Sequence, residues 1–451
     1  MIQSTRGQAQ GVERRYLDFD RFFASAEQHF NADLRGRPLG VVPLDSPHTG
    51  CIAVSRQAKA LGVKSGTTVK QAREIIPDMI FVVARHDVYV RLHKRILEVI
   101  DTVVPVSKVR SIDEVVCNLL AHEAREGAAL SQRMKSALAE AFSDTLSCSI
   151  GMAPTELLAK IGAELNKPDG FVLIEADDLP ARLEHIDLDD LPGISKGMRA
   201  RLTAAHVNDF KSLWELAPKQ ARAIWGSVEG ERFWNGLHGY HIERPETKKS
   251  MFGHSRMLPH DWRAPDKIRA CSRLLTTSTA RWLRRADVRA TKLSLSLRGG
   301  GYRRQDGSRS KDLSWSWETT FAPARDDHTF LQAVSEGLAK SERAMKFRPK
   351  SVSVVIHGLI AEQDRIADLF GETKDPSGRG ADNASRAKWE KVSDLLDTLR
   401  QSHGPKAMSL GPQDNILGGY LGAKIAFGRI PDEHDFSEAP VADEDTHFLS
   451  Y

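Results

Sequence analysis

The chain has 451 residues, of which 41% are hydrophobic and 27% are charged, and its formal net charge at pH 7 is +4. This length is too great for one hydrophobic core and predicts two to four domains of a globular protein. No apolar run approaches the length of a membrane span, and the N-terminus lacks the apolar core of a signal peptide, so we expect a cytoplasmic protein without a membrane partner. The four cysteines lie far apart without CxxC spacing, which favours reduced, buried thiols over a zinc site or a disulfide framework.

The first half of the chain is predicted to alternate between strands and helices. Residues 15–30 predict a strand that enters a helix, and a small segment with short apolar runs, Gly and Pro extends from there to about residue 77. Up to about residue 175, β-branched runs such as MIFVVA and VVCNLL alternate with helical patterns such as AALSQRMKSALAEAF. Residues 176–242 are mostly helical, with turns around LPGIS and WGSVEG, and the polar stretch RPETKK at 244–249 is a linker candidate.

Residues 250–360 predict the order β-α-β-β-α-β, which describes a compact four-stranded sheet with two helices on one face. Trp315 and Trp317 share a strand face there and are expected in the core against the helices. Residues 361–451 contain one predicted helix, RAKWEKVSDLLDTLRQ, and an acidic end that we expect to be partly disordered.

Charge is distributed unevenly along the chain. Residues 244–360 hold 24 Lys and Arg against 11 Asp and Glu, whereas residues 361–451 hold 10 against 17. A basic block of this kind is typical of a module that binds a polyanion, and a solvated basic face is the alternative interpretation. Its cations include Arg281, Arg284, Arg285, Arg298, Arg303, Arg304, Arg309 and Lys311.

Two pairs of acidic residues stand at predicted strands. Asp18 and Asp20 are two residues apart and therefore share a strand face, while Asp113 and Glu114 follow a turn and lead a β-branched run. If the two strands converge, three carboxylates could hold two Mg²⁺ ions, which prefer oxygen ligands and can activate an attacking hydroxyl. The spacing alone also fits two exposed strand ends.

A set of motifs narrows these alternatives. YLDFDRFFASAE, LRGRPLGVV, SIDE, CSIGMAPTELLAKIGAELNKPDGF and LPGIS occur in this order, and together they closely resemble the Y-family (translesion) DNA polymerases of the bacterial polymerase IV/V type. The resemblance covers about residues 14–360. It implies an α+β fold with a right-hand polymerase core, a β-α-β-β-α-β little finger and a C-terminal tail. The implied parts are the palm (14–30 and 78–175), the fingers (31–77), a helical thumb (176–243), the little finger (250–360) and a C-terminal extension (361–451).

The resemblance assigns the acidic residues to different roles. Asp18 matches the first metal-binding aspartate, and the backbone carbonyl of Phe19 is the ligand beside it. Asp113 matches the second metal ligand, and Glu114 matches the carboxylate next to the primer 3′-hydroxyl, which is also implied as a metal ligand. The implied cofactor is therefore Mg²⁺ with two ions per site. Asp20 matches an acidic position that is not normally a direct ligand, so we interpret it as a bystander.

Further positions concern the nucleotide. Phe23 matches the steric gate, an aromatic ring that leaves no room for a 2′-hydroxyl, with Phe22 as the buried neighbour. Arg56 and Lys59 stand where the family usually has Tyr and Arg, which preserves a cationic site but removes the phenol and the bidentate geometry. Lys167 matches the lysine that reaches the β- and γ-phosphates. Lys160, on the preceding helix, is interpreted as structural or DNA-facing.

DNA contacts are expected in two places. The stretch DLPGISKGMRARL resembles a helix-hairpin-helix, whose backbone amides can hold a phosphate without reading sequence, although Ser195 replaces the glycine usually found two residues after Gly193. The expected little-finger contacts are Arg298, Arg303, Arg304, Arg309 and Lys311. The peptide IADLF resembles clamp-binding peptides through Asp368, Leu369 and Phe370, and packing of these residues on their own domain is the alternative.

The leading hypothesis is therefore a template-directed translesion DNA polymerase, a monomer whose partners are primer-template DNA, a dNTP and, through IADLF, the sliding clamp. A non-catalytic, polymerase-like adaptor in a mutagenesis complex is the alternative, although such relatives typically lose the metal carboxylates that are present here. A nucleotide cyclase with a similar palm would have no use for the thumb-like and basic blocks.

Overall fold

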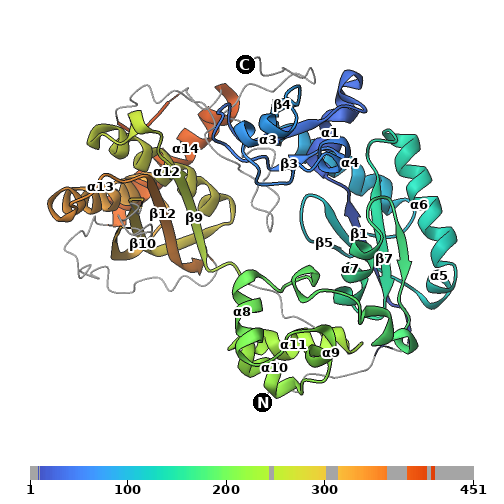
Figure 1. Cartoon of the computed structure of the whole chain (residues 1–451). Coiled ribbons are helices and arrows are strands. Elements are labelled where there is room, and N and C mark those ends of the chain that lie inside the picture. The colour runs from blue at the N-terminus through green and yellow to red at the C-terminus, as the bar shows by residue number, and fades with distance from the viewer. Residues whose placement is uncertain are drawn as a thin grey trace, which may run out of the picture. The chain divides into compact units, whose positions relative to one another are not determined.

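A computed structural model describes residues 9, 11–242, 248–300, 313–362, 383–403 and 408–411 (Figure 1). The chain forms two compact units that divide at residue 245, so most of the predicted linker at 244–249 lies outside the described residues. Within the described ranges, no helix is long and apolar enough to cross a membrane.

The N-terminal unit is built on a five-stranded sheet with the strand order β5-β6-β1-β7-β8. The central strand β1 is antiparallel to both β6 and β7, and β8 runs parallel to β7. The elements of this unit are β1 (Arg14–Phe19), α1 (Phe22–Phe30), β2 (Leu39–Val42), β3 (Ala53–Val54), α2 (Arg56–Ala60), α3 (Val69–Ile75), β4 (Ile80–Val83), α4 (His86–Asp101), β5 (Lys108–Val109), β6 (Glu114–Asn118), α5 (Ala121–Arg125), α6 (Gly127–Ala141), β7 (Cys148–Ala153), α7 (Glu156–Leu165), β8 (Phe171–Leu173), α8 (Lys196–Ala204), α9 (Phe210–Trp214), α10 (Pro218–Trp225) and α11 (Val228–Leu237).

Alternation along β1 divides the core into two layers. Leu17 and Phe19 point into a cluster with side chains of α1, α4 and α6, whereas Tyr16 points into a second cluster with α7 and the helical segment that follows β8. Both faces of the sheet are therefore covered, which explains why β1 is buried over nearly its whole length. Asp18 is two residues from Tyr16 and so belongs to the face that α7 covers.

A smaller sheet and a helical segment complete this unit. Strands β3, β2 and β4 form a three-stranded sheet in which β2 is parallel to β4 and antiparallel to β3. A separate apolar cluster holds this sheet together with α2 and α3. The helices from α8 to α11 pack around Leu202 and Phe210, and the Thr155 hydroxyl, at the start of α7, donates a hydrogen bond to the Gly236 carbonyl at 2.6 Å.

The C-terminal unit confirms the predicted β-α-β-β-α-β order. Its elements are β9 (Met251–Met257), α12 (Pro265–Arg285), β10 (Val288–Arg298), β11 (Ser314–Ala324), α13 (Asp327–Ala344) and β12 (Ser351–Ala361), followed by α14 (Asn383–His403). The antiparallel sheet has the strand order β11-β10-β12-β9. Alternate leucines of β10 and aliphatic residues of β12 point toward α12 and α13, and the residues between them are largely serines.

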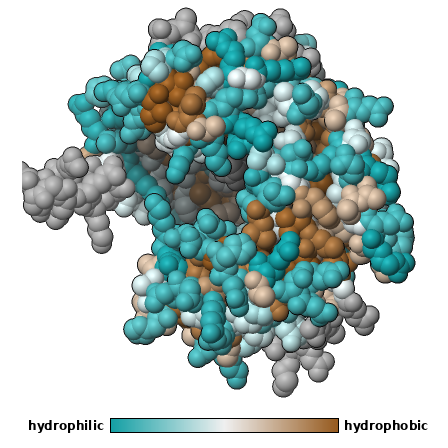
Figure 2. Space-filling model, turned by 45° about the vertical axis from the view of Figure 1, so that its right-hand side comes forward, coloured by the Kyte–Doolittle hydropathy of each residue, from teal (hydrophilic) through white to brown (hydrophobic). Residues whose placement is uncertain are grey.

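Trp315 and Trp317 pack against this core, as predicted. Gly337 of α13 permits the approach, because a Cβ atom at that position would lie 2.6 Å from the Trp317 ring. On the face of the molecule that Figure 2 shows, hydrophilic side chains surround several separate groups of apolar ones. Large exposed apolar side chains, such as Leu61, Leu120 and Met257, likewise belong to different elements, and single exposed side chains of this kind are ordinary in globular proteins.

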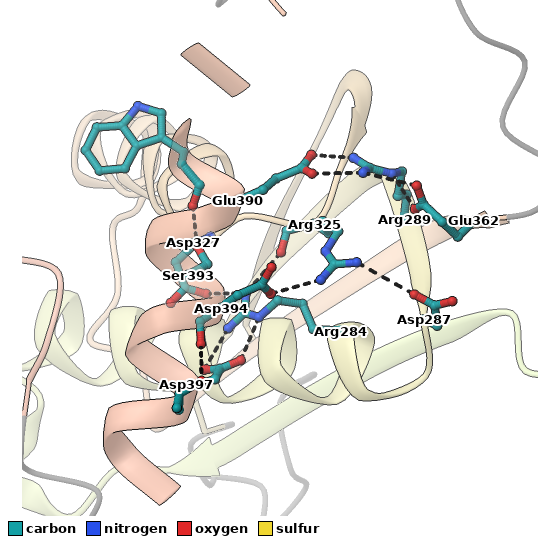
Figure 3. A network of polar contacts seen from close by, with 12 residues as sticks. Arg284, Asp287, Arg289, Arg325, Asp327, Glu362, Glu390, Ser393, Asp394 and Asp397 are labelled. Carbon is teal, nitrogen blue, oxygen red and sulfur yellow. Dashed lines mark hydrogen bonds and ion pairs between the residues drawn. The ribbon is translucent and has the colours of Figure 1, made fainter. Parts of the chain in front are cut away.

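The predicted helix of the C-terminal extension is present as α14, which packs against α13. Its carboxylates meet arginines of the C-terminal unit, as Figure 3 shows: Asp397 accepts from Arg284, and Glu390 accepts from Arg289. Arg284 is also paired with Asp327, and its side chain is only 3% exposed. The sequence-based expectation that Arg284 belongs to a basic DNA-binding surface is therefore wrong, because its charge is already neutralised inside the protein.

Candidate active site

The two acidic motifs lie on neighbouring strands. Asp18 on β1 and Glu114 on β6 are directly opposite each other in the antiparallel pairing. The backbone N–H of Phe19 donates to the carbonyl oxygen of Asp113 at 2.9 Å, which fixes the SIDE turn against the end of β1. Residues that are about a hundred positions apart in the sequence are thus brought together by one strand pair.

Each of the three carboxylates has a polar partner. Lys167 places its Nζ 2.7 Å from Asp18, Lys160 donates to Glu114, and the Ser111 hydroxyl donates to Asp113. Lys160, interpreted from the sequence as structural or DNA-facing, is therefore a partner of an acidic site residue. In this arrangement, the described residues contain no group of three or more His, Cys, Asp or Glu close enough together to hold a metal ion.

Burial dominates the electrostatics of the site. It raises the pKa of Asp18 to about 7, although the Lys167 ammonium acts in the opposite direction. Burial also raises the pKa of Asp113, against the hydrogen bond from Ser111. A buried carboxylate with a raised pKa gains stability from any further cation that approaches it, and the hard carboxylate oxygens match the ligand preference of Mg²⁺. The donor set therefore fits a divalent cation in its chemistry.

Asp20 has a different environment from that of Asp18. Its Oδ1 accepts from the Ser149 hydroxyl at 2.9 Å, while its Oδ2 accepts from the Ser147 hydroxyl at 2.9 Å and from the backbone N–H of Asp169 at 2.8 Å. Both oxygens are thus hydrogen-bonded, and the statement that Asp20 is not a ligand stays a prediction. The interpretation of Asp20 as a bystander misses this network, since none of its three donors lies near residue 20 in the sequence.

The two phenylalanines that follow are both buried. Phe22 is 2% exposed and Phe23 is 5% exposed, so burial does not distinguish the expected gate from its neighbour. Phe23 stacks on Tyr89 of α4 with ring centroids 4.9 Å apart. The Tyr89 hydroxyl donates to the fully buried Glu27 at 2.6 Å, and Arg85 neutralises Glu27 at 2.7 Å. The Phe23 ring therefore rests on a side chain that is itself fixed.

The expected phosphate-binding cations are differently placed. Arg56 and Lys59 lie exposed on the short helix α2, and the Arg56 charge contributes, after burial, to a lowered pKa of Arg21 next to Asp20. Lys167 pairs with Asp18 and, at 2.9 Å, with Glu164. Burial opposes its charge, but the Asp18 carboxylate prevails and raises the pKa of Lys167.

Of the expected DNA-binding residues, Gly193 and Ser195 form an exposed turn before α8. Gly193 has a φ of +94°, and Ser195 caps α8 by accepting from the Met198 N–H at 3.5 Å. Arg298 is exposed at the end of β10. Outside the described residues lie Arg303, Arg304, Arg309 and Lys311, together with the clamp-peptide residues Asp368, Leu369 and Phe370.

Comparison with known proteins identifies the family. Residues 17–164 match the impB/mucB/samB family, and residues 248–369 match the C-terminal domain of that family. DNA polymerase IV of Moorella thermoacetica is 29% identical over 371 residues, which cover 79% of this chain and 88% of that protein. DNA polymerase IV of Saccharolobus solfataricus is 29% identical over 250 residues, which cover 54% of this chain and 70% of that protein.

The fold is also similar to that of solved polymerase structures. A chimeric Y-family DNA polymerase based on Dbh superposes with a TM-score of 0.63 at 20% identity, over 77% of this chain and 99% of that one. At this level of identity the structural similarity establishes the fold alone. The family assignment rests on the two family matches, which together cover more than half of the sequence. The chain belongs to the impB/mucB/samB family, the Y family of translesion DNA polymerases.

Proposed function

We propose that this chain is a template-directed DNA polymerase that adds deoxynucleotides to a primer 3′ end, past damaged bases, with Asp18, Asp113 and Glu114 as its catalytic carboxylates. The observation that carries the proposal is the strand pairing that sets Asp18 opposite Glu114 and bonds Phe19 to Asp113. Relatives that share this family are named DNA polymerase IV and align over most of the chain. Y-family polymerases are metal-dependent nucleotidyltransferases.

The proposed cofactor is Mg²⁺, with two ions per site. Asp18, Asp113, Glu114 and the Phe19 carbonyl would hold the metal ions, with Glu114 on the side of the primer end. Bound Mg²⁺ would favour attack by the 3′-hydroxyl and stabilise the leaving pyrophosphate. The raised pKa of Asp18 means that the protein alone, including Lys167, stabilises the negative charge of this carboxylate only weakly. A cation of higher charge would therefore be a better partner than Lys167.

The chain's own residues would grip and select the nucleotide. Lys167 would exchange Asp18 for the β- and γ-phosphates, and the exposed Arg56 and Lys59 would supply further cations to the triphosphate. Phe23, fixed by its stacking on Tyr89, would exclude a 2′-hydroxyl. A ring held by a stacking partner would make a more selective gate than a mobile one.

DNA would be held without reference to its sequence. The exposed turn at Gly193 and Ser195 would offer backbone amides to a phosphate, and Arg298 with Arg303, Arg304, Arg309 and Lys311 would hold the duplex. The enzyme would act as a monomer, and a sliding clamp would bind it through Asp368, Leu369 and Phe370.

The deciding experiment is primer extension with Mg²⁺ and dNTPs. The wild type should extend the primer distributively, and Asp18→Asn and Asp113→Asn should abolish extension while leaving primer-template binding intact. Glu140→Gln, which neutralises an exposed carboxylate on α6, is the matched control and should extend normally. A wild-type protein that binds primer-template but adds no nucleotide would instead establish the adaptor alternative.

A further inference from the structure

The turn that carries Lys167 is held from two sides by charged side chains. Asp20, after β1, accepts from the backbone N–H of Asp169 at 2.8 Å. Lys135, on α6, lies 2.9 Å from the Asp169 carboxylate and also donates to the Asp169 carbonyl oxygen. The main-chain N–H, the main-chain carbonyl and the side chain of Asp169 are thus all engaged by residues distant in sequence.

The backbone of this turn needs such support. Asp169 has a φ of +56°, in the left-handed region that residues other than glycine seldom adopt. A conformation of this kind persists where the surroundings determine it through several contacts. Asp20 and Lys135 supply these contacts, and the residue two positions before Asp169 is Lys167.

Asp20 is itself held rigidly. It is 5% exposed, its own N–H donates to the Ser147 carbonyl at 3.0 Å, and its carboxylate accepts from the hydroxyls of Ser147 and Ser149. Ser149 is fully buried within β7. The support therefore runs from the central sheet through Asp20 to the Lys167 turn.

We propose that Asp20 is a positioning residue that holds the Lys167 turn, and thereby sets the place from which Lys167 reaches the triphosphate. Asp20 touches neither the substrate nor a metal ion in this role, because its oxygens are committed to Ser147, Ser149 and Asp169. The inference deepens the proposed function, on which it rests, since it takes Lys167 to be the triphosphate lysine.

The prediction concerns hydrogen bonds, so the charge of Asp20 should matter little. Asp20→Ala removes both acceptor oxygens, and with them three hydrogen bonds. It should raise the KM for the incoming dNTP by about 10-fold, with a smaller change in kcat, because leaving a buried donor unsatisfied has an effect of that order. Asp20→Asn keeps an amide oxygen that can accept from the Asp169 N–H and should remain within about 3-fold of the wild type. If Asp20 were a metal ligand, Asn would be nearly as harmful as Ala.

Two further variants separate positioning from general damage. Lys135→Met acts on the same turn from the opposite side and should raise the KM in the same direction. Lys167→Ala should raise the KM by itself, and Asp20→Ala should add little on that background, because the residue that it positions is gone. The Kd of the dNTP for the enzyme bound to a dideoxy-terminated primer should change as the KM does, and this measurement requires no turnover.

Each outcome has a defined meaning. Near-zero added effect of Asp20→Ala in the Lys167→Ala background supports the inference, and fully additive effects overturn it. Equal losses in Asp20→Ala and Asp20→Asn overturn it in favour of a role for the charge. If Lys167→Ala leaves both KM and Kd unchanged while the wild type extends primers, the assignment of Lys167 is wrong and the inference falls with it, although the polymerase activity stands.

Discussion

Replacing Asp397 by Asn in α14 should destabilise the C-terminal unit, although the change lies beyond the part of the chain that matches the family's C-terminal domain. Asp397 accepts from Arg284 twice, at 2.7 Å from Nε and 3.0 Å from Nη2 (Figure 3). Arg284 in turn donates from Nη1 to Asp327 at 2.8 Å and to the Arg325 carbonyl at 3.0 Å. Its guanidinium is thus buried between carboxylates of two helices.

The magnitude follows from what remains after the substitution. Removing one partner of a buried ion pair typically costs about 3–5 kcal/mol. Arg284 keeps Asp327, and the Asn amide oxygen can still accept one bond, so we expect a loss of about 2 kcal/mol in the free energy of unfolding. Asp394→Asn makes the same charge change on the same helix, but Asp394 is 51% exposed and pairs with Arg325 at the surface. That variant should lose at most about 1 kcal/mol.

The assay is urea unfolding of the full chain, monitored by tryptophan fluorescence. The chain has eight tryptophans, and one of them, Trp389 of α14, stacks on His328 with ring centroids 4.1 Å apart, so undocking of the helix contributes to the fluorescence change. Asp397→Asn should lower the urea midpoint clearly more than Asp394→Asn, with the slope of the transition unchanged. Equal shifts for the two variants would refute the reasoning, because they would make net charge, and not the buried pair, the source of the effect.

Three further predictions concern pH, the gate and the DNA grip. Burial lowers the pKa of His93 from 6.5 to about 4, so the unfolded chain binds a proton that the folded chain does not as pH falls below 6.5. The contribution of His93 to the free energy of unfolding is therefore fully present above pH 6.5 and is about 2 kcal/mol smaller at pH 5. His93→Leu should reduce the difference between the urea midpoints at pH 7 and pH 5. An unchanged difference would exclude His93 as its source. Phe23→Ala should raise ribonucleotide incorporation, measured as the ratio of kcat/KM for an rNTP and its dNTP, whereas a rise only in Phe22→Ala would make Phe22 the gate. DNA affinity should fall steeply with salt concentration. Arg298→Ala should reduce the magnitude of the negative slope of log K against log salt by about 1. A flat salt response in the wild type would exclude DNA binding dominated by phosphate contacts.

The parts of the fold that follow local rules could be predicted from the sequence. The β-α-β-β-α-β order depends on strict alternation in the strands and helical spacing between them, and these periodicities reflect the burial of one face. The same rule predicts that Trp315 and Trp317, which share a strand face, lie toward the core, and both are partly buried against it. Periodicity alone does not predict that Asp18 and Glu114 lie close together. This prediction depends on the set of motifs that resembles the polymerase family.

Contacts between distant segments could not be predicted in this way. Arg284 stands among other cations in the sequence, and nothing near it shows that Asp397, which is 113 positions away, will neutralise it. The partners of Asp20 lie 127 to 149 positions away and include a backbone N–H, which leaves no trace in residue types. A cationic composition therefore overstates the charge that a folded surface offers to DNA.

The two aspartates of LDFD show why a shared strand face does not imply a shared role. Asp18 is paired with Lys167, and under the proposed function its carboxylate would exchange this partner for a metal ion when a triphosphate binds. Asp20 accepts from two hydroxyls and one main-chain N–H, which are neutral and fixed by the sheet and the turn. To bind a cation through both oxygens, Asp20 would have to release at least one of these buried donors, because three of its roughly four acceptor positions are occupied. A donor left unsatisfied costs about 1–3 kcal/mol. The difference between the two carboxylates thus lies in their partners: under the proposed function, Asp18 would exchange Lys167 for a metal ion, whereas Asp20 would hold the turn that carries Lys167.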